Sequence, residues 1–315
     1  MCGIIGTLVK NCETVKAEIM LIYTAQKRRG KDGFGIVIRK EDGRFIRERT
    51  RTIKELINTG IFEKIDNGDI IVFHHREPTS TPNIPHCNHP FMNEDRTIAL
   101  AHNGVVSHAQ KALDKTKKRH RYESLILPDK DNNTDKKYYY HVTDSEIALH
   151  TLEDYLEDRT RKDALIRLQR KFSGTFFIIF QEEKLLYFTT NASDLAIYYS
   201  ISGNTFLSSE FGKKIDRDCV GFFDGSDVKY IYTPKYRNYY NYRYYNTSWD
   251  CMDFYGNYCD IYDIITMWEN SKDLKNCKSQ NCTVCYLFDD CIDRFITELS
   301  SDEDLLYIGE EENME

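Results

Sequence analysis

The chain opens with MCGIIGTLVKN at residues 1–11, where a cysteine directly follows the initiator methionine. The Ile, Thr, Leu and Val residues that follow predict a β-strand over Cys2–Lys10. A residue as small as cysteine normally allows Met1 to be removed, which leaves Cys2 with a thiol and a free α-amine. Because an α-amine titrates near about 8, it can take the proton of that thiol at working pH. A solitary cysteine here is more often a small apolar strand residue, so the prediction of a nucleophile depends on further motifs.

Donors for an oxyanion follow an expected strand at Thr97–His102. Hydrolysis of a side-chain amide develops negative charge on the carbonyl oxygen, and hydrogen-bond donors must be in place to stabilise it. Asn103 offers its amide side chain and Gly104 its backbone N–H. Read alone, this Asn-Gly pair is an ordinary turn.

Groups suited to the charged ends of free glutamine occur in two other motifs, HHREPTS and TDSE. Arg76 can bind the α-carboxylate with two parallel hydrogen bonds, and Thr79 adds a hydroxyl. Asp144 can hold the α-ammonium group. Each motif also has a structural interpretation: Arg76 as a member of a surface ion pair, and Thr143 with Glu146 as a capping box at a helix N-terminus.

The order of these motifs along the chain is more specific than any one of them. In that order the chain resembles the class II glutamine amidotransferases, which belong to the N-terminal nucleophile hydrolases, over roughly residues 2–230. The motifs that carry the resemblance are MCGIIG at 1–6, RRGKDGFG at 28–35, HHREPTS at 74–80, NHPF at 88–91, AHNG at 101–104, TDSE at 143–146, FSGTF at 172–176 and SSE at 208–210.

The resemblance implies an α+β fold, a four-layer α/β/β/α sandwich of two antiparallel sheets with the active site between the sheets at one edge. It also implies hydrolysis of L-glutamine to glutamate and ammonia through a γ-glutamyl thioester. The residue roles that it implies are Cys2 as the nucleophile, Asn103 and the Gly104 amide as the oxyanion hole, Arg76 for the glutamine carboxylate with Thr79 beside it, Asp144 for the ammonium, and Arg29 near the catalytic end.

Strands predominate in the rest of the pattern, and the short turns between them indicate antiparallel pairing. A helix is expected from about Glu13 to Arg28, and Gly30, Gly33 and Gly35 are expected to form turns before a buried strand at Ile36–Ile38. EDGR predicts a hairpin directly after that strand. Further strands are predicted at Asp69–His75, Thr175–Gln181, Lys184–Thr190, Leu195–Ser200 and Thr205–Ser208, and helices at Asp144–Leu156 and Arg161–Arg170.

Composition changes twice along the chain. Thr116–Tyr140 is polar and charged and is interpreted as a long surface insertion. Residues 1–232 are predicted to form the amidotransferase domain, and residues 233–315 a Tyr- and Cys-rich extension with an acidic tail. This extension is too short for the usual ammonia-consuming domains, so a separate synthase subunit is expected to receive the ammonia. The alternatives are a hydrolase of another γ-glutamyl amide and a non-catalytic binding module on the same fold.

The formal net charge of −7 and a pI near 5.8 argue against nucleic acid as a partner. The basic stretch Lys111–Arg121 is interpreted as a solvated helix end or loop. No apolar run approaches the roughly 20 residues that a bilayer requires, so no membrane partner is expected. The N-terminus lacks the features of a signal peptide, which predicts a cytoplasmic protein with reduced cysteines.

Four of the ten cysteines follow each other closely near the C-terminus as C-x4-C-x2-C-x5-C. They are Cys277, Cys282, Cys285 and Cys291. The first three spacings match a plant-type iron–sulfur motif, but the fourth does not, and the pattern is not a common zinc signature. Reduced thiols in a helix are the favoured interpretation, and neither a metal nor another cofactor is expected.

Overall fold

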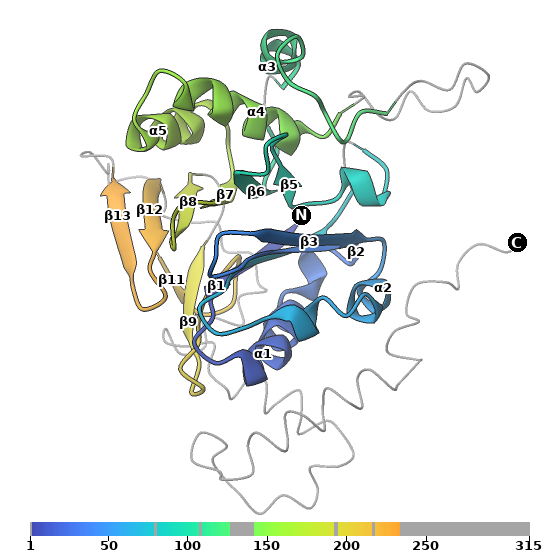
Figure 1. Ribbon diagram of the computed structural model, residues 1–315, viewed down its shortest axis with the longest axis vertical. Coiled ribbons are helices and arrows are strands. Elements are labelled where there is room, and N and C mark those ends of the chain that lie inside the picture. Colours follow the sequence, from blue (N-terminus) through green and yellow to red (C-terminus); the bar gives the residue numbers. More distant parts are fainter. Residues whose placement is uncertain are drawn as a thin grey trace, which may run out of the picture.

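The computed structural model describes residues 2–78, 81–106, 109–126, 142–191, 195–215 and 218–233. In this part of the chain two antiparallel sheets lie face to face, with helices on their outer sides (Figure 1). The predicted domain 1–232 is therefore described with gaps. The predicted extension, the four C-terminal cysteines and most of the predicted insertion lie outside the described residues.

Strand β1 lies at the centre of the first sheet, between β10 and β4. The strand order of this sheet is β11-β9-β10-β1-β4-β2-β3. Its strands are β1 (Gly3–Leu8), β2 (Asp32–Arg39), β3 (Phe45–Thr50), β4 (Ile70–Arg76), β9 (Ala196–Tyr199), β10 (Thr205–Ser208) and β11 (Lys213–Lys214).

The second sheet has the strand order β13-β12-β8-β7-β6-β5. Its strands are β5 (Phe91–Met92), β6 (Ile98–Asn103), β7 (Thr175–Phe180), β8 (Leu186–Thr190), β12 (Cys219–Phe223) and β13 (Val228–Tyr232). The central strands are buried along their whole length, which explains why they are apolar runs rather than alternating patterns.

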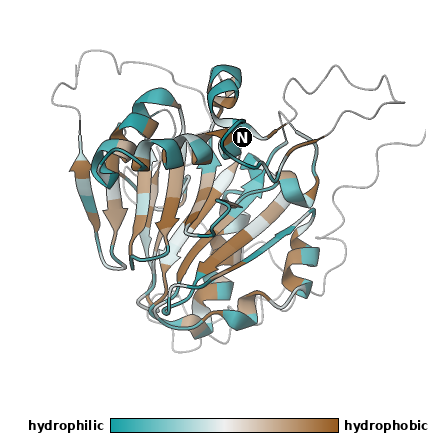
Figure 2. Cartoon of the chain, turned by 45° about the horizontal axis from the view of Figure 1, so that its top comes forward, coloured by the Kyte–Doolittle hydropathy of each residue, from teal (hydrophilic) through white to brown (hydrophobic). Residues whose placement is uncertain are grey.

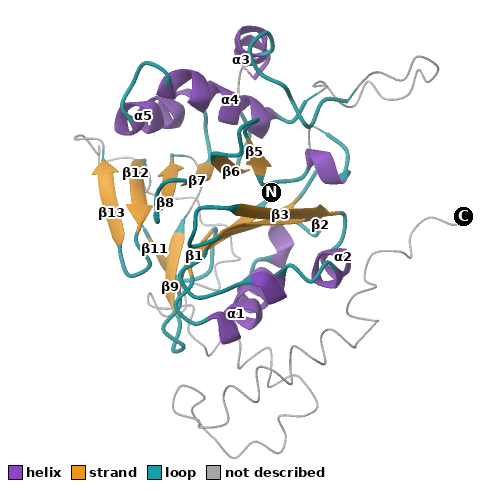
Figure 3. Cartoon of the chain, viewed as in Figure 1, coloured by secondary structure: helices purple, strands orange, loops and turns teal. Residues whose placement is uncertain are grey.

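Helices cover the outer face of each sheet, except that α3 lies against α4 (Figure 3). They are α1 (Cys12–Ala25), α2 (Ile53–Asn58), α3 (Ala109–Thr116), α4 (Asp144–Leu156) and α5 (Arg161–Lys171), with 3-10 turns η1 (Lys27–Arg29), η2 (Phe62–Lys64) and η3 (Pro85–Cys87). Figure 2 shows apolar residues concentrated on the strands and polar residues on the outer surfaces of the helices.

Three apolar clusters fill the spaces between four layers. Neighbouring residues of β1 point to opposite faces, so Ile5 packs with α1 and α2 while Ile4 packs between the two sheets. The third cluster joins α4 and α5 to the second sheet, for example through Ile147 and Phe176. The predicted α/β/β/α sandwich is confirmed.

The predicted elements are present with small shifts of their ends. The first helix ends at Ala25, three residues early, and continues as the separate 3-10 turn η1. EDGR forms the predicted hairpin between β2 and β3. Strands β5, β11, β12 and β13 and helix α2 were not predicted, although the turn of Asp224–Asp227 is a hairpin signal.

The expectation for the glycine-rich segment was wrong in part. Gly33 and Gly35 lie inside β2 rather than in a loop before it. Gly33 has a φ of 70° at an irregularity in the β2–β4 pairing. A Cβ atom at Gly35 would lie 1.9 Å from the His89 carbonyl oxygen, so the glycine is required by close backbone approach and not by a turn.

No helix in the described part of the chain combines the length and the apolar character of a membrane span.

Candidate active site

Cys2 lies at the end of the central strand, where β1 meets β4. Gly3 pairs with His75, and the Cys2 Sγ atom is 3.8 Å from the Glu77 carbonyl oxygen, within reach of S–H donation. Burial raises the pKa of the Cys2 thiol above its ordinary value, and the positive charge of Arg76 only partly offsets this. The thiol is therefore protonated at neutral pH, and its use as a nucleophile requires a base.

The charge of Arg76 lowers the pKa of the Cys2 thiol and the charge of Asp144 raises it, so both groups lie within electrostatic range of the sulfur. We call the place formed by Cys2, Arg76, Asn103 and Asp144 the Cys2 edge. These residues come from the ends of β1, β4 and β6 and from the first residue of α4. Antiparallel pairing within each sheet and the packing of the two sheets bring these ends together.

Asn103 is connected to the Cys2 strand through a residue to which no role was assigned from the sequence. Its Nδ2 atom donates to Ser209 Oγ at 3.1 Å, and the same oxygen accepts the Ile4 N–H at 3.0 Å. The Ser209 N–H in turn donates to the Ile4 carbonyl oxygen at 3.1 Å. Ser209 is fully buried, so it joins the second sheet to β1 two residues from the thiol. In the sequence, the SSE motif at 208–210 was the signal that could have identified Ser209.

Gly104 and Gly174 pack against each other beside the end of β6. A Cβ atom at Gly104 would lie 2.7 Å from the Gly174 Cα atom and 2.7 Å from His102 Nε2. A Cβ atom at Gly174 would lie 2.6 Å from the Asn103 carbonyl oxygen. Both positions therefore exclude any side chain, which explains the glycine of the AHNG motif and that of the FSGTF motif.

The guanidinium of Arg76 is buried and surrounded by acceptors of the chain that follows it. Its two terminal nitrogens donate four hydrogen bonds, to the Thr81 and Pro82 carbonyl oxygens and to the side chains of Thr81 and Asn88. The side chain is 3% exposed. A carboxylate that binds here must replace some of these acceptors. Thr79, predicted beside it, lies outside the described residues.

Asp144 begins α4 with both carboxylate oxygens hydrogen-bonded. Oδ2 accepts the Val106 N–H at 2.9 Å, and Oδ1 accepts from Ser145 Oγ at 3.3 Å. The capping box considered for this helix is not formed, because Thr143 makes no side-chain cap. Glu146 instead accepts hydrogen bonds from Ser124 and from the Glu123 N–H.

Arg29 also contacts the Cys2 residue. Its Nε atom donates to the Cys2 carbonyl oxygen at 2.9 Å, and its NH1 group pairs with Glu210. Arg29 is 7% exposed. It therefore holds the backbone of Cys2, whereas the sequence predicted only a place near the catalytic end.

Three buried histidines lie behind the Cys2 edge. His75 Nδ1 donates to the Gly30 carbonyl oxygen at 2.6 Å, and burial lowers its pKa to about 4. Burial also lowers the pKa values of His74 and His89 well below the usual value. His74 and His89 pack with ring centroids 4.1 Å apart. All three are therefore neutral at physiological pH, and the positive charge of this region comes from the guanidinium groups of Arg76 and Arg29.

A separate cavity of about 500 Å³ lies along α4 and α5, lined by residues such as Tyr155, Arg167 and Lys171. No residue of the Cys2 edge lines this cavity.

Known proteins resemble this chain in fold. No family model matches it. A glutamine–fructose-6-phosphate aminotransferase (isomerizing) of Sulfurisphaera tokodaii is 23% identical over 219 residues, which make up 67% of this chain and 33% of that protein. A solved glutamine phosphoribosylpyrophosphate amidotransferase from B. subtilis has a TM-score of 0.52 and 17% identity over 74% of this chain and 50% of that one. A structure described as the allosteric regulatory enzyme of purine biosynthesis has a TM-score of 0.54 and 16% identity over the same shares.

The chain has the fold of the class II glutamine amidotransferase domain. The resemblance inferred from the eight motifs is confirmed at the level of the fold. This amidotransferase-fold chain spans one third of the length of the curated relative and half the length of the two solved structures.

Proposed function

We propose that the chain hydrolyses the side-chain amide of L-glutamine, with Cys2 as the nucleophile after removal of Met1. The observation that supports this most directly is the Cys2 edge itself. There a partly buried thiol lies within the electrostatic range of one guanidinium and one carboxylate, and Ser209 links its strand to the Asn103 amide.

The reaction begins with transfer of the thiol proton to the α-amine of Cys2, which supplies the base that the raised thiol pKa requires. The sulfur bonds to the amide carbon, and the oxyanion accepts hydrogen bonds from Asn103 Nδ2 and the Gly104 N–H. The amine returns its proton to the departing nitrogen, so ammonia leaves and a γ-glutamyl thioester remains. Water then attacks the thioester, releasing glutamate and restoring the thiol.

Each charged group of glutamine is bound by a residue of opposite charge. The α-carboxylate binds Arg76 in exchange for acceptors such as the Thr81 and Pro82 carbonyl oxygens, and Thr79 contributes a hydroxyl. Asp144 binds the α-ammonium group. Arg29 is a positioning residue, because its hydrogen bond to the Cys2 carbonyl oxygen fixes the nucleophile's backbone.

The ammonia passes to a synthase partner in the cytoplasm, with residues 1–232 as the amidotransferase domain. Two similar proteins, the glutamine–fructose-6-phosphate aminotransferase and the glutamine phosphoribosylpyrophosphate amidotransferase, support an ammonia acceptor of this general kind.

The proposal is tested by glutamate release from glutamine by the full chain, after intact mass has established that Met1 is absent. Diazo-oxonorleucine, a glutamine-mimicking electrophile, is expected to alkylate Cys2 and stop the reaction. The matched control is Cys12→Ala, which removes another partly buried thiol near the N-terminus and is expected to retain full activity. Absence of glutamate release from the Met1-free chain, with and without a copurifying partner, would reject the proposal.

A further inference from the structure

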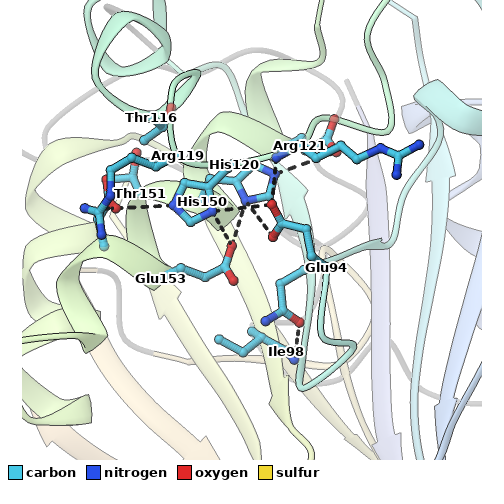
Figure 4. Close-up of polar contacts among 12 residues, drawn as sticks. Glu94, Ile98, Thr116, Arg119, His120, Arg121, His150, Thr151 and Glu153 are labelled. Atoms are coloured by element: carbon cyan, nitrogen blue, oxygen red, sulfur yellow. Dashed lines mark hydrogen bonds and ion pairs between the residues drawn. The ribbon is translucent and has the colours of Figure 1, made fainter.

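Four side chains from three segments converge on the outer surface of the second sheet (Figure 4). Glu94 follows β5, His120 follows α3, and His150 and Glu153 lie three residues apart on one face of α4. We call these four residues the α4 cluster. Each offers one ligand atom, and the four atoms all lie within 4.8 Å of one another.

The distances suit a four-coordinate metal ion. Around tetrahedral zinc, with bonds of about 2.0–2.2 Å, neighbouring ligand atoms lie about 3.3–3.5 Å apart. His120 Nδ1 lies 3.6 Å from Glu94 Oε1 and 3.5 Å from Glu153 Oε2, and His150 Nδ1 lies 3.8 Å from Glu94 Oε2. His150 Nδ1 and Glu153 Oε2, now 2.6 Å apart, need to separate by less than about 1 Å.

A second carboxylate faces the far nitrogen of each imidazole. His120 Nε2 lies 3.2 Å from Asp154 Oδ1, and His150 Nε2 lies 3.9 Å from Glu146 Oε1. Histidines that bind a metal through one ring nitrogen usually direct the other at a carboxylate, which fixes the tautomer and raises ligand basicity. His120 has this arrangement, whereas His150 Nε2 makes no hydrogen bond to Glu146 among the described residues.

Charge also favours a cation between the two rings. The His120 and His150 rings are stacked with centroids 4.6 Å apart, and the carboxylates of Glu94 and Glu153 lie beside them. The side chain of His150 is 1% exposed, and that of Glu146 is fully buried. One divalent ion bound by two neutral imidazoles would balance the Glu94 and Glu153 carboxylates without placing two like charges in contact.

We propose that Glu94, His120, His150 and Glu153 bind one structural zinc ion. Imidazole and carboxylate ligands suit zinc, and four protein ligands close the coordination sphere as in structural sites. The ion would cross-link three segments: the one after α3, the turn after β5, and helix α4. Helix α4 also carries Asp144 of the Cys2 edge as its first residue. The proposal does not depend on glutamine hydrolysis, and its test measures metal binding and stability.

The test uses the full chain, stripped with a chelator and titrated with Zn²⁺ by calorimetry. One equivalent is expected to bind to the native chain and to be absent in Glu94→Gln, which alters a partly exposed side chain, and in His120→Ala. The matched control is Glu157→Gln, a carboxylate that pairs with Arg119 outside the cluster and is expected to leave zinc binding unchanged. Asp154→Asn is expected to keep the stoichiometry and weaken affinity by about 10- to 100-fold.

Two further measurements separate the alternatives. At free Zn²⁺ about 100 times the dissociation constant, the Tm of the native chain is expected to rise by roughly 5–10 °C, with no rise in Glu94→Gln. Substituted Co²⁺ is expected to show a tetrahedral visible spectrum without a sulfur charge-transfer band. The proposal would be overturned if the native chain, Glu94→Gln and His120→Ala bound the same amount of zinc with the same Tm shift, which would indicate that the cluster is a metal-free group of ion pairs. A Co²⁺ spectrum dominated by thiolate ligands would also overturn it, in favour of cysteine ligation.

Discussion

Helix α4 contributes to both the Cys2 edge and the α4 cluster, yet the two regions surround their imidazoles differently. Behind the Cys2 edge, His74 and His75 donate to carbonyl oxygens, and both ring nitrogens of His89 lack a partner among the described residues. In the α4 cluster both nitrogens of His120 and Nδ1 of His150 pair with carboxylates, and His150 Nε2 lies 3.9 Å from Glu146 Oε1 without a hydrogen bond. Histidines therefore lie near a guanidinium group behind the Cys2 edge, whereas in the α4 cluster they lie among several carboxylates. The first environment suits an anionic ligand and the second a cation.

The largest effect is expected at the Cys2 edge from Cys2→Ala. Loss of the nucleophile should lower the rate of glutamate release by at least about 10⁴-fold while leaving the fold intact. Zinc binding by the α4 cluster should be unchanged, because the two regions are independent. Steady-state glutaminase assays and the Tm of the variant check this. Turnover near the native rate would contradict the assignment of Cys2 as the nucleophile.

The buried histidines should make stability depend on pH. In the folded chain the pKa of His75 is about 4, whereas in the unfolded chain it is near 6.5. Between these two pH values the unfolded state therefore binds more protons than the folded state. Stability from this group is fully present above about pH 6.5 and falls by about 3 kcal/mol as the pH drops to 4. Urea unfolding at several pH values measures the loss.

A pair of variants sharpens that measurement. His89→Phe replaces two buried ring nitrogens by carbon and should weaken the dependence on pH, because burial holds the pKa of His89 low as well. His86→Phe, at an exposed position, should keep the native dependence. Equal slopes in all three proteins would contradict the assignment of neutral histidines to this region.

Asn103→Ala should lower kcat by about 10²-fold with a much smaller change in KM, because the lost donor acts on the oxyanion and not on bound glutamine. A change confined to KM would instead assign Asn103 to substrate binding. Single-turnover measurements of glutamate formation distinguish the two results.

The smallest effect is expected from Ser209→Ala, which removes the acceptor shared by Asn103 Nδ2 and the Ile4 N–H. The freed amide loses its orientation, and kcat should fall by about 10-fold. Ser208→Ala is the matched control, since Ser208 is equally buried but bonds to Phe211. The control should lose a similar amount of stability and keep its kcat.

Much of the fold could be predicted from local patterns. The runs at Ile70–Arg76, Ile98–Asn103 and Thr175–Phe180 are apolar because both faces of their strands are buried, and the helix at Asp144–Leu156 has the boundaries expected. The place of Gly35 could not be predicted, because it depends on the backbone of His89, which lies more than fifty residues further along the chain.

The sequence by itself predicted the type of candidate site, because the thiol and the α-amine of Cys2 belong to one residue once Met1 is removed. The apolar runs with short turns between them predicted antiparallel strands, and the resemblance carried by the eight motifs predicted the four-layer fold. Only the tertiary structure assigned Ser209 to a contact with β1 and Arg29 to a contact with Cys2, and brought Glu94, His120 and His150 together. Hydrogen bonds and ligand sets between distant segments have no local spacing rule, since their geometry arises only when the layers pack.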